Sequence, residues 1–198
     1  MDLSIMRARN HLMDLEPFDK GTGHVNAIIE TPKGSRNKFK YDEKIGIFRL
    51  GGALPVGATF PFDFGYIPST KAGDGDPLDI LILMDDPAFV GCLVPAKLIG
   101  VIEAEQTVDQ ETTRNDRLIA VAADSRNHSH VRFLGDLNDN LVHEIEQFFV
   151  SYNKTKRKKF ELLGRFGPER AQGLISSAAT NFIKSRRTAD RSTQKTKR

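Results

Sequence analysis

The chain has 198 residues with a formal net charge of +3, and 39% of its residues are hydrophobic. This length suits one domain with extensions, and the hydrophobic fraction is sufficient for a core. The single cysteine, Cys92, excludes an internal disulfide framework and indicates a reducing compartment. The sequence has neither an apolar run of roughly 18 residues nor a secretory N-terminus, and it therefore predicts a cytoplasmic protein that does not cross a membrane.

The basic charge is concentrated at the C-terminal end of the chain. Residues 184–198 hold seven Lys or Arg and one Asp, so the rest of the chain has 22 basic and 25 acidic residues and a net charge of −3. We expect one domain over residues 1–183 and a basic, disordered tail over residues 184–198.

Short apolar and β-branched segments, separated by turn residues, predict strands through the first two thirds of the chain. The segments 38–41 and 45–50 flank a short polar turn and are expected to form a hairpin. Residues 51–68 are rich in Gly, Pro and Phe and contain few helix formers. The predicted strands are 25–30, 38–41, 45–50, 78–84, 92–104 (bent at Gly100) and 117–123.

Helical periodicity appears only near the C-terminus. Apolar residues recur at helical spacing over 141–152, with Asn138 or Asp139 as the N-cap, and a second helix is predicted over 169–184. The pattern favours a mainly β fold with some α-helix: a small β-barrel with one or two packed helices.

The acidic segment Asp74-Gly75-Asp76-Pro77-Leu78-Asp79 is the strongest functional signal. Three carboxylates so close together repel one another unless a cation neutralises them, and Mg²⁺ prefers oxygen ligands. A simple polar turn would explain Asp74 and Asp76. It would not explain Asp79, which lies within the strand pattern and opposite in phase to its apolar neighbours.

Other phosphate and metal motifs are absent, including GxxxxGK[ST], GxGxxG after a strand, HExxH and CxxC. Basic and hydroxyl side chains that could hold phosphate oxygens are scattered along the chain, and their spacing does not show that they converge. These candidates are Lys40, Tyr41, Arg49, Arg117, Tyr152 and the lysines of 154–159.

Several segments resemble, in order, the Mg²⁺-dependent barrel family of soluble inorganic pyrophosphatases (family I). DGDPLDI (74–80) resembles the family signature, and FPFDFGYIPST (60–70) resembles the segment before it. AIIETP (27–32), FKYD (39–42), RLIAV (117–121) and FFVSYNK (148–154) resemble further family segments. The resemblance implies a five-stranded OB-like β-barrel with two packed C-terminal helices. It also implies hydrolysis of pyrophosphate with Mg²⁺ as cofactor, in a homo-oligomer. A hexamer is favoured over a dimer.

The resemblance also implies roles for individual residues. Asp74, Asp79 and Asp116 would bind the first metal and Asp109 a later one, while Glu30 would hold metal-bound waters. Asp76 would be the general base for the attacking water. Lys40, Arg49 and Tyr152 would bind phosphate and assist catalysis, with Arg117 and Lys154 as further substrate-binding residues.

The chain departs from the family pattern at several of these positions. Phe64 stands where the family often has Tyr, and Asn153 stands where a Lys usually follows the tyrosine. Counting back from RLIAV without a gap places Gln110 and Asn115, not Asp109 and Asp116, in the later metal positions. These departures leave open an inactive metal-binding relative. A second alternative is an OB-type nucleic-acid-binding module, because a barrel with basic loops could also bind oligonucleotides.

Overall fold

A computed structural model describes the chain from residue 12 to residue 195, and the side chains from residue 12 to residue 188. The strands are β1 (Val25–Thr31), β2 (Asn37–Asp42), β3 (Ile47–Ala53), β4 (Asp63–Tyr66), β5 (Asp79–Leu83), β6 (Leu93–Val108), β7 (Glu111–Arg114), β8 (Arg117–Ala122) and β9 (Lys159–Phe166). The helices are η1 (Leu134–Asp136), α1 (Asp139–Thr155) and α2 (Pro168–Lys195).

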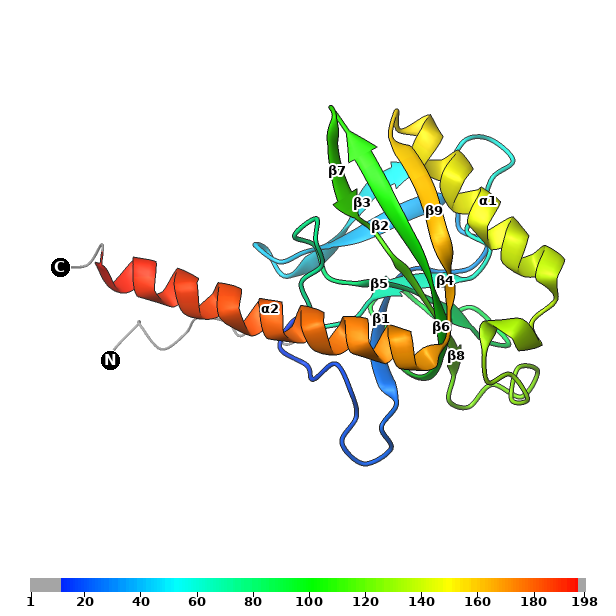
Figure 1. Ribbon diagram of the computed structural model, residues 1–198, viewed down its shortest axis with the longest axis horizontal. Helices are drawn as coiled ribbons and strands as arrows, with labels where there is room; N and C mark the ends of the chain where they lie inside the picture. The colour runs from blue at the N-terminus through cyan, green and yellow to red at the C-terminus, as the bar shows by residue number, and fades with distance from the viewer. Residues whose placement is uncertain (1–11, 196–198) are drawn as a thin grey trace.

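Five strands form a closed ring, which confirms the predicted barrel. β1, β4, β5, β8 and β6 pair in this order, and β6 pairs back to β1. All of these pairs are antiparallel except β5–β8, which is parallel. β7 and β9 pair with the long β6, while β2 and β3 form a separate hairpin (Figure 1). The register of β6 against β8 shifts next to Gly100, where the sequence predicted a bend.

Three strands were missed from the sequence: β4, β7 and β9. β4 lies within the segment rich in Gly, Pro and Phe, and all four of its residues are buried. Gly65 lets β4 approach β1, because a Cβ at this position would lie 2.0 Å from the carbonyl oxygen of Ile28. β9 follows the lysine-rich stretch and obtains its hydrogen bonds from β6, a partner that local sequence does not reveal.

Helix α1 begins where the sequence predicted, because the Asn138 side chain accepts a hydrogen bond of 2.9 Å from the Asn140 backbone N–H. Its buried residues include Val142, Phe149 and Tyr152, and these pack with Phe64 in one core cluster. This packing positions the last turn of α1, which includes Tyr152, next to the cavity described below.

Helix α2 covers a second core cluster, in which Ala171 and Ile175 pack with Ile80 of the ring. The helix continues to Lys195, whereas the sequence predicted a disordered tail from residue 184. No Gly or Pro interrupts 184–195, and Arg186 forms an ion pair with Asp14. The distal part of α2 extends beyond the barrel (Figure 1), and residues 196–198 lie outside the described residues.

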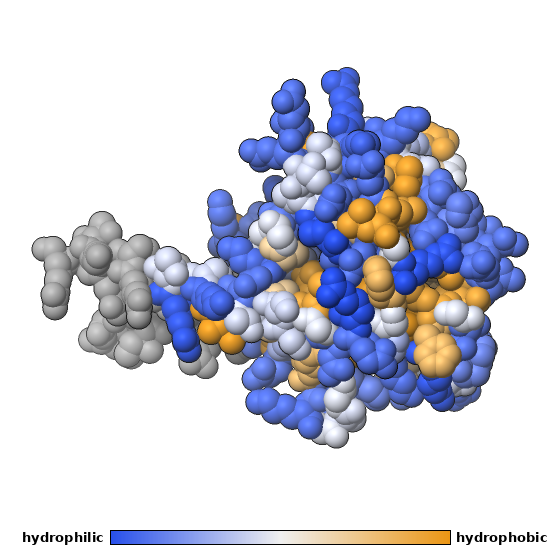
Figure 2. Space-filling view, viewed as in Figure 1, coloured by the Kyte–Doolittle hydropathy of each residue, from blue (hydrophilic) through white to orange (hydrophobic). Residues whose placement is uncertain are grey.

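The surface is more polar than the two core clusters. Figure 2 shows a largely hydrophilic face on which smaller hydrophobic areas interrupt the charged side chains. Exposed apolar side chains of the fold include Leu163 and Phe166 of β9. None of the described helices is long and apolar enough to span a membrane.

Candidate active site

A cavity of about 230 Å³ lies between the β2–β3 hairpin, the acidic loop and the end of α1. Side chains from segments far apart in sequence meet there: carboxylates on the loop and on β1, lysines on β2 and after α1, and amides and an arginine beside β8. The principal lining residues are Glu30, Lys38, Lys40, Tyr66, Asp74, Asp76, Asp79, Gln106, Asn115, Arg117, Tyr152, Lys156 and Lys158.

The acidic segment forms a tight turn that leads into β5. The Ala72 N–H donates to the Asp76 carbonyl over 2.8 Å, and the Asp76 N–H donates to the Asp74 carboxylate over 3.2 Å. Asp79 is the first residue of β5, and its side chain points to the face that the alternation of strand residues predicts. It lies on the face of Leu81 and Leu83, while Ile80 and Ile82 belong to the core cluster under α2.

Arg117 holds Asp79 in place. Its Nη1 lies 2.6 Å from the Asp79 carboxylate, and its side chain is 4% exposed. The guanidinium also lies 4.9 Å from the ring centre of Phe149, which restricts its movement. The Arg117 guanidinium is therefore a fixed positive charge next to Asp79, where the acidic loop joins β5.

The other two loop carboxylates have different surroundings. The Lys40 ammonium lies 2.7 Å from the Asp76 carboxylate in a half-exposed ion pair. Burial, together with the negative charges of Asp79 and Asp76, raises the pKa of Asp74 above its ordinary value. Binding of a cation beside Asp74 would relieve this repulsion.

Glu30, on β1, is the most strongly perturbed acid of the cavity. It is 7% exposed, and its carboxylate accepts a hydrogen bond of 2.8 Å from the Tyr41 N–H. Burial raises the pKa of Glu30 to about 7, although this hydrogen bond opposes the shift. Next to it, the Tyr66 hydroxyl is buried and has no hydrogen-bond partner among the described residues.

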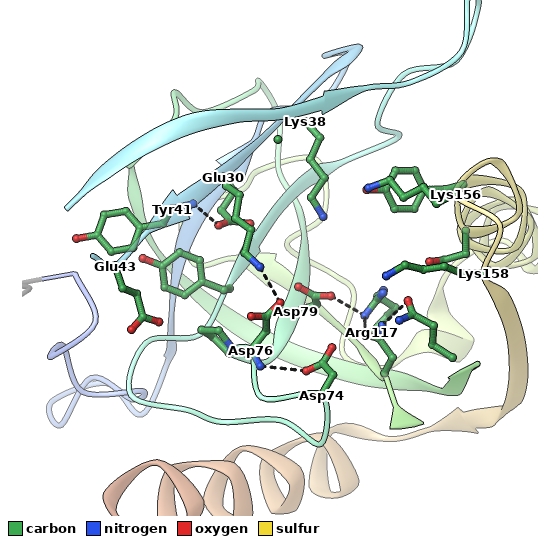
Figure 3. Close-up of a pocket in the computed structure, with 18 of the residues that line it drawn as sticks. Glu30, Lys38, Tyr41, Glu43, Asp74, Asp76, Asp79, Arg117, Lys156 and Lys158 are labelled. Atoms are coloured by element: carbon green, nitrogen blue, oxygen red, sulfur yellow. Dashed lines mark hydrogen bonds and ion pairs between the residues drawn. The ribbon is translucent and has the colours of Figure 1, made fainter. Parts of the chain in front are cut away.

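A basic wall, formed by Lys38, Lys156 and Lys158, faces the carboxylates across the cavity (Figure 3). The Lys156 ammonium donates a hydrogen bond to the Tyr152 hydroxyl over 2.5 Å. The Lys38 ammonium lies 4.8 Å from the ring centre of Phe64. Within the part of the chain whose side chains are described, these three lysines form no ion pair with a carboxylate.

Two predicted phosphate-binding residues do not reach the cavity. The Arg49 side chain is 65% exposed and lies 3.4 Å from the Asp42 carboxylate, which holds it along the hairpin. Lys154 is exposed and is not part of the cavity wall. It follows Tyr152 by two residues and therefore points to a different side of α1.

The later metal positions also differ from the prediction. Asp109 is exposed at the tip of the β6–β7 hairpin, where it has a positive φ of 47°. Asp116 turns away from the cavity and accepts hydrogen bonds from Arg114 and from the Ala104 N–H. Asn115 lines the cavity instead and pairs with Gln106, while Gln110 lies in the hairpin turn beside Asp109.

Some of these placements had signals in the sequence. Consecutive residues of an extended chain point to opposite faces, so placing Arg117 in the site implies Asn115 rather than Asp116. The same alternation places Lys38 beside Lys40. Lys156 follows Tyr152 by four residues, the spacing that brings two side chains together on a helix. The positions of Arg49 and Lys158, in contrast, depend on the hairpin and on β9.

The two departures near Tyr152 have structural explanations. Phe64 is fully buried among aromatic side chains, where a hydroxyl would need its own partner. Asn153 is also buried, and its amide donates a hydrogen bond of 2.9 Å to the Phe149 carbonyl. Phe64 thus lacks the hydroxyl of the expected tyrosine, and Asn153, although it lines the cavity, lacks the charge of the expected lysine.

The donor set fits a hard cation such as Mg²⁺. Its members are carboxylate oxygens, and Asp74 and Asp79 lie on one loop beside the buried hydroxyl of Tyr66. Within the described side chains, no three acidic, His or Cys groups enclose a metal position by themselves. Mg²⁺ does not require such an enclosure, because it keeps several waters and is held in proteins by one or two carboxylates plus substrate phosphates.

Comparisons with known proteins agree with this geometry. Residues 27–183 match the family model described as inorganic pyrophosphatase. The chain is 34% identical to the inorganic pyrophosphatase of Synechocystis sp. over 172 residues, which cover 86% of this chain and 99% of that protein. It is 35% identical to the Thermus thermophilus inorganic pyrophosphatase over 149 residues, which cover 75% and 83% of the two chains.

Solved structures show the same architecture. The crystal structure of the Thermus thermophilus inorganic pyrophosphatase superposes with a TM-score of 0.78 at 31% identity, covering 87% of this chain and 98% of that one. The structure of an inorganic pyrophosphatase from Neisseria gonorrhoeae also has a TM-score of 0.78, at 28% identity, and covers 87% and 99% of the two chains.

Proposed function

Since this chain belongs to family I of the inorganic pyrophosphatases, whose reaction is the hydrolysis of pyrophosphate to two phosphates, we propose that its active site is the cavity between the acidic loop and the basic wall. The family is metal-dependent, and we propose Mg²⁺ as the metal that this site uses.

The observation that carries the proposal is the two-sided charge of the cavity. Carboxylates of the acidic loop line one side, and the ammonium groups of Lys38, Lys156 and Lys158 line the other (Figure 3). A carboxylate surface alone would repel pyrophosphate, and a lysine surface alone would not bind metal. Together they suit a complex of a highly charged anion with divalent cations.

Each group has a chemical role in this proposal. Asp74 and Asp79 would hold Mg²⁺, and Glu30 would hold metal-bound water. When bound there, Mg²⁺ would supply positive charge against pyrophosphate and would acidify a water molecule. Asp76 accepts the proton of that water as it attacks the phosphorus in line. Arg117 keeps Asp79 oriented, since its Nη1 lies 2.6 Å from the Asp79 carboxylate.

Lys156 takes the substrate-binding role that the sequence suggested for Lys154. We expect Lys156→Met to raise the KM for pyrophosphate about five- to tenfold, because it removes a charged hydrogen-bond donor from the cavity wall. The kcat should change less, since the loss affects binding of substrate and transition state alike. Steady-state phosphate release at saturating Mg²⁺ measures both constants.

Lys154→Met is the matched control, because it removes the same charge two residues away and outside the cavity. Its KM should stay within about twofold of the wild-type value. Equal increases of KM in the two variants would mean that only the overall positive charge of this segment matters, and Lys156 would lose its assigned role.

The homo-oligomer, with a hexamer favoured over a dimer, stays a prediction from the family, as does the cytoplasmic location. Sedimentation equilibrium of the purified chain would decide the first.

A further inference from the structure

Lys40 occupies an unusual place for a phosphate-binding lysine. Its ammonium points at the Asp76 carboxylate over 2.7 Å, although the two residues lie 36 positions apart in the chain. The lysines of the basic wall face the cavity without such a partner among the described side chains. Lys40 is thus the lysine of this cavity that already neutralises the acidic loop.

The surroundings of Lys40 are acidic as a whole. Asp76 is its direct partner, and the charges of Glu30 and Asp79 also act on the ammonium. The basic groups that face the same carboxylates are Arg117, which is held by Asp79, and Lys38, whose ammonium lies over Phe64. Burial opposes the charged form of Lys40, but the hydrogen bond from Lys40 to Asp76 and the negative charges together raise its pKa.

We propose that Lys40 is a tethered counter-ion of the acidic loop, which competes with divalent cations and must leave Asp76 before the loop binds Mg²⁺ at full strength. Released by metal binding, its ammonium would then be free for a phosphate oxygen. The inference deepens the proposed function, since it concerns the metal requirement of the same site.

The physical basis is competition between like charges for one set of carboxylates. An ammonium 2.7 Å from a carboxylate lowers the negative potential that a metal ion would otherwise meet. The pair is half exposed, with 47% of the Lys40 side chain and 58% of the Asp76 side chain accessible. Exposed pairs of this kind are weak, so Mg²⁺ can displace the lysine, but at a higher metal concentration.

The test is Mg²⁺ affinity of the full chain, measured by isothermal titration calorimetry without pyrophosphate. We expect Lys40→Met to bind Mg²⁺ about three- to tenfold more tightly than the wild type, since the competing charge is gone. Lys40→Arg keeps the ion pair and should bind Mg²⁺ like the wild type. Circular dichroism of each variant verifies that it is folded.

Lys38→Met is the matched control, because it removes a lysine of the same strand that lines the same cavity but does not pair with the loop. Its Mg²⁺ affinity should change by no more than about twofold. Unchanged affinity in folded Lys40→Met, or equal tightening in Lys38→Met, would overturn the proposal. Because substrate is absent, a failure of wild-type phosphate release would count against the proposed function and not against this inference.

Discussion

Asp76→Asn should lower the kcat for pyrophosphate hydrolysis by roughly 10²–10⁴-fold, the usual contribution of a general base. The amide keeps the size of the side chain but cannot accept the proton of the attacking water. Asp76 is suited to this role because its side chain is 58% exposed and, within the described part of the chain, pairs only with the half-exposed Lys40, whereas Asp79 is held by the buried Arg117. Steady-state kinetics at saturating Mg²⁺ measures the loss.

Mg²⁺ binding by the same variant separates the two roles of a carboxylate. We expect the affinity to stay within about threefold of the wild type, because Asp74 and Asp79, the proposed metal ligands, are unchanged and the lost Asp76 charge was already neutralised by Lys40. Asp86→Asn, in the exposed loop after β5, is the control and should retain both activity and binding. If Asp76→Asn lost metal binding and turnover to the same extent, Asp76 would be a metal ligand and not the base.

Glu30→Gln should stabilise the metal-free protein at neutral pH by roughly 3 kcal/mol, the difference between a pKa of about 7 in the folded chain and the ordinary value of 4.5. Between these two pH values the folded protein keeps the Glu30 proton while the unfolded chain has lost it. The free energy of unfolding of the wild type therefore falls as the pH rises from about 4.5 to about 7.

The neutral amide introduced by Glu30→Gln can still accept the hydrogen bond of the Tyr41 N–H, so the variant should lack this decline. Urea unfolding in EDTA at pH 4.5, 6 and 7.5 measures the difference between the two proteins. Parallel stability curves would show that Glu30 is ionised at neutral pH in the folded protein, contrary to its burial. At neutral pH, Mg²⁺ should stabilise the wild type more than the variant, because metal charge favours ionised Glu30.

The sequence predicted the elements whose signals are local. The alternation around Asp79 predicted its orientation in β5, and the apolar stripe predicted α1. That Asp79, Glu30, Arg117 and Tyr152 share one site was implied only by the family resemblance, and all four line the cavity. β4 and β9 escaped prediction because their hydrogen bonds come from partners distant in sequence, whereas β7 is a four-residue polar strand that pairs with the end of β6 across a two-residue turn. β4 in particular is extended because β1 and β5 enclose it, although its own residues are typical of a turn.

The predicted site residues that lie outside the cavity are placed there by turns and by the arrangement of elements. Whether Arg49 reaches the cavity depends on how the β2–β3 hairpin lies over the barrel, and the position of Asp109 depends on a two-residue turn. The positions of Lys156 and Asn115 could have been predicted from the sequence, through helical spacing and strand alternation respectively. The Lys40–Asp76 pair was not, since nothing local relates two residues on separate elements.

The most direct test of the account is phosphate release from pyrophosphate with Mg²⁺ and with EDTA, beside ATP and tripolyphosphate. If the cavity with carboxylates on one side and the basic wall on the other is the active site, we expect fast, Mg²⁺-dependent release of phosphate from pyrophosphate. We expect little release of phosphate from ATP and tripolyphosphate. Absence of release from folded protein that binds Mg²⁺ would contradict it. That result would mean that the basic wall does not compensate, in activity, for the hydroxyl missing at Phe64 and the lysine missing at Asn153.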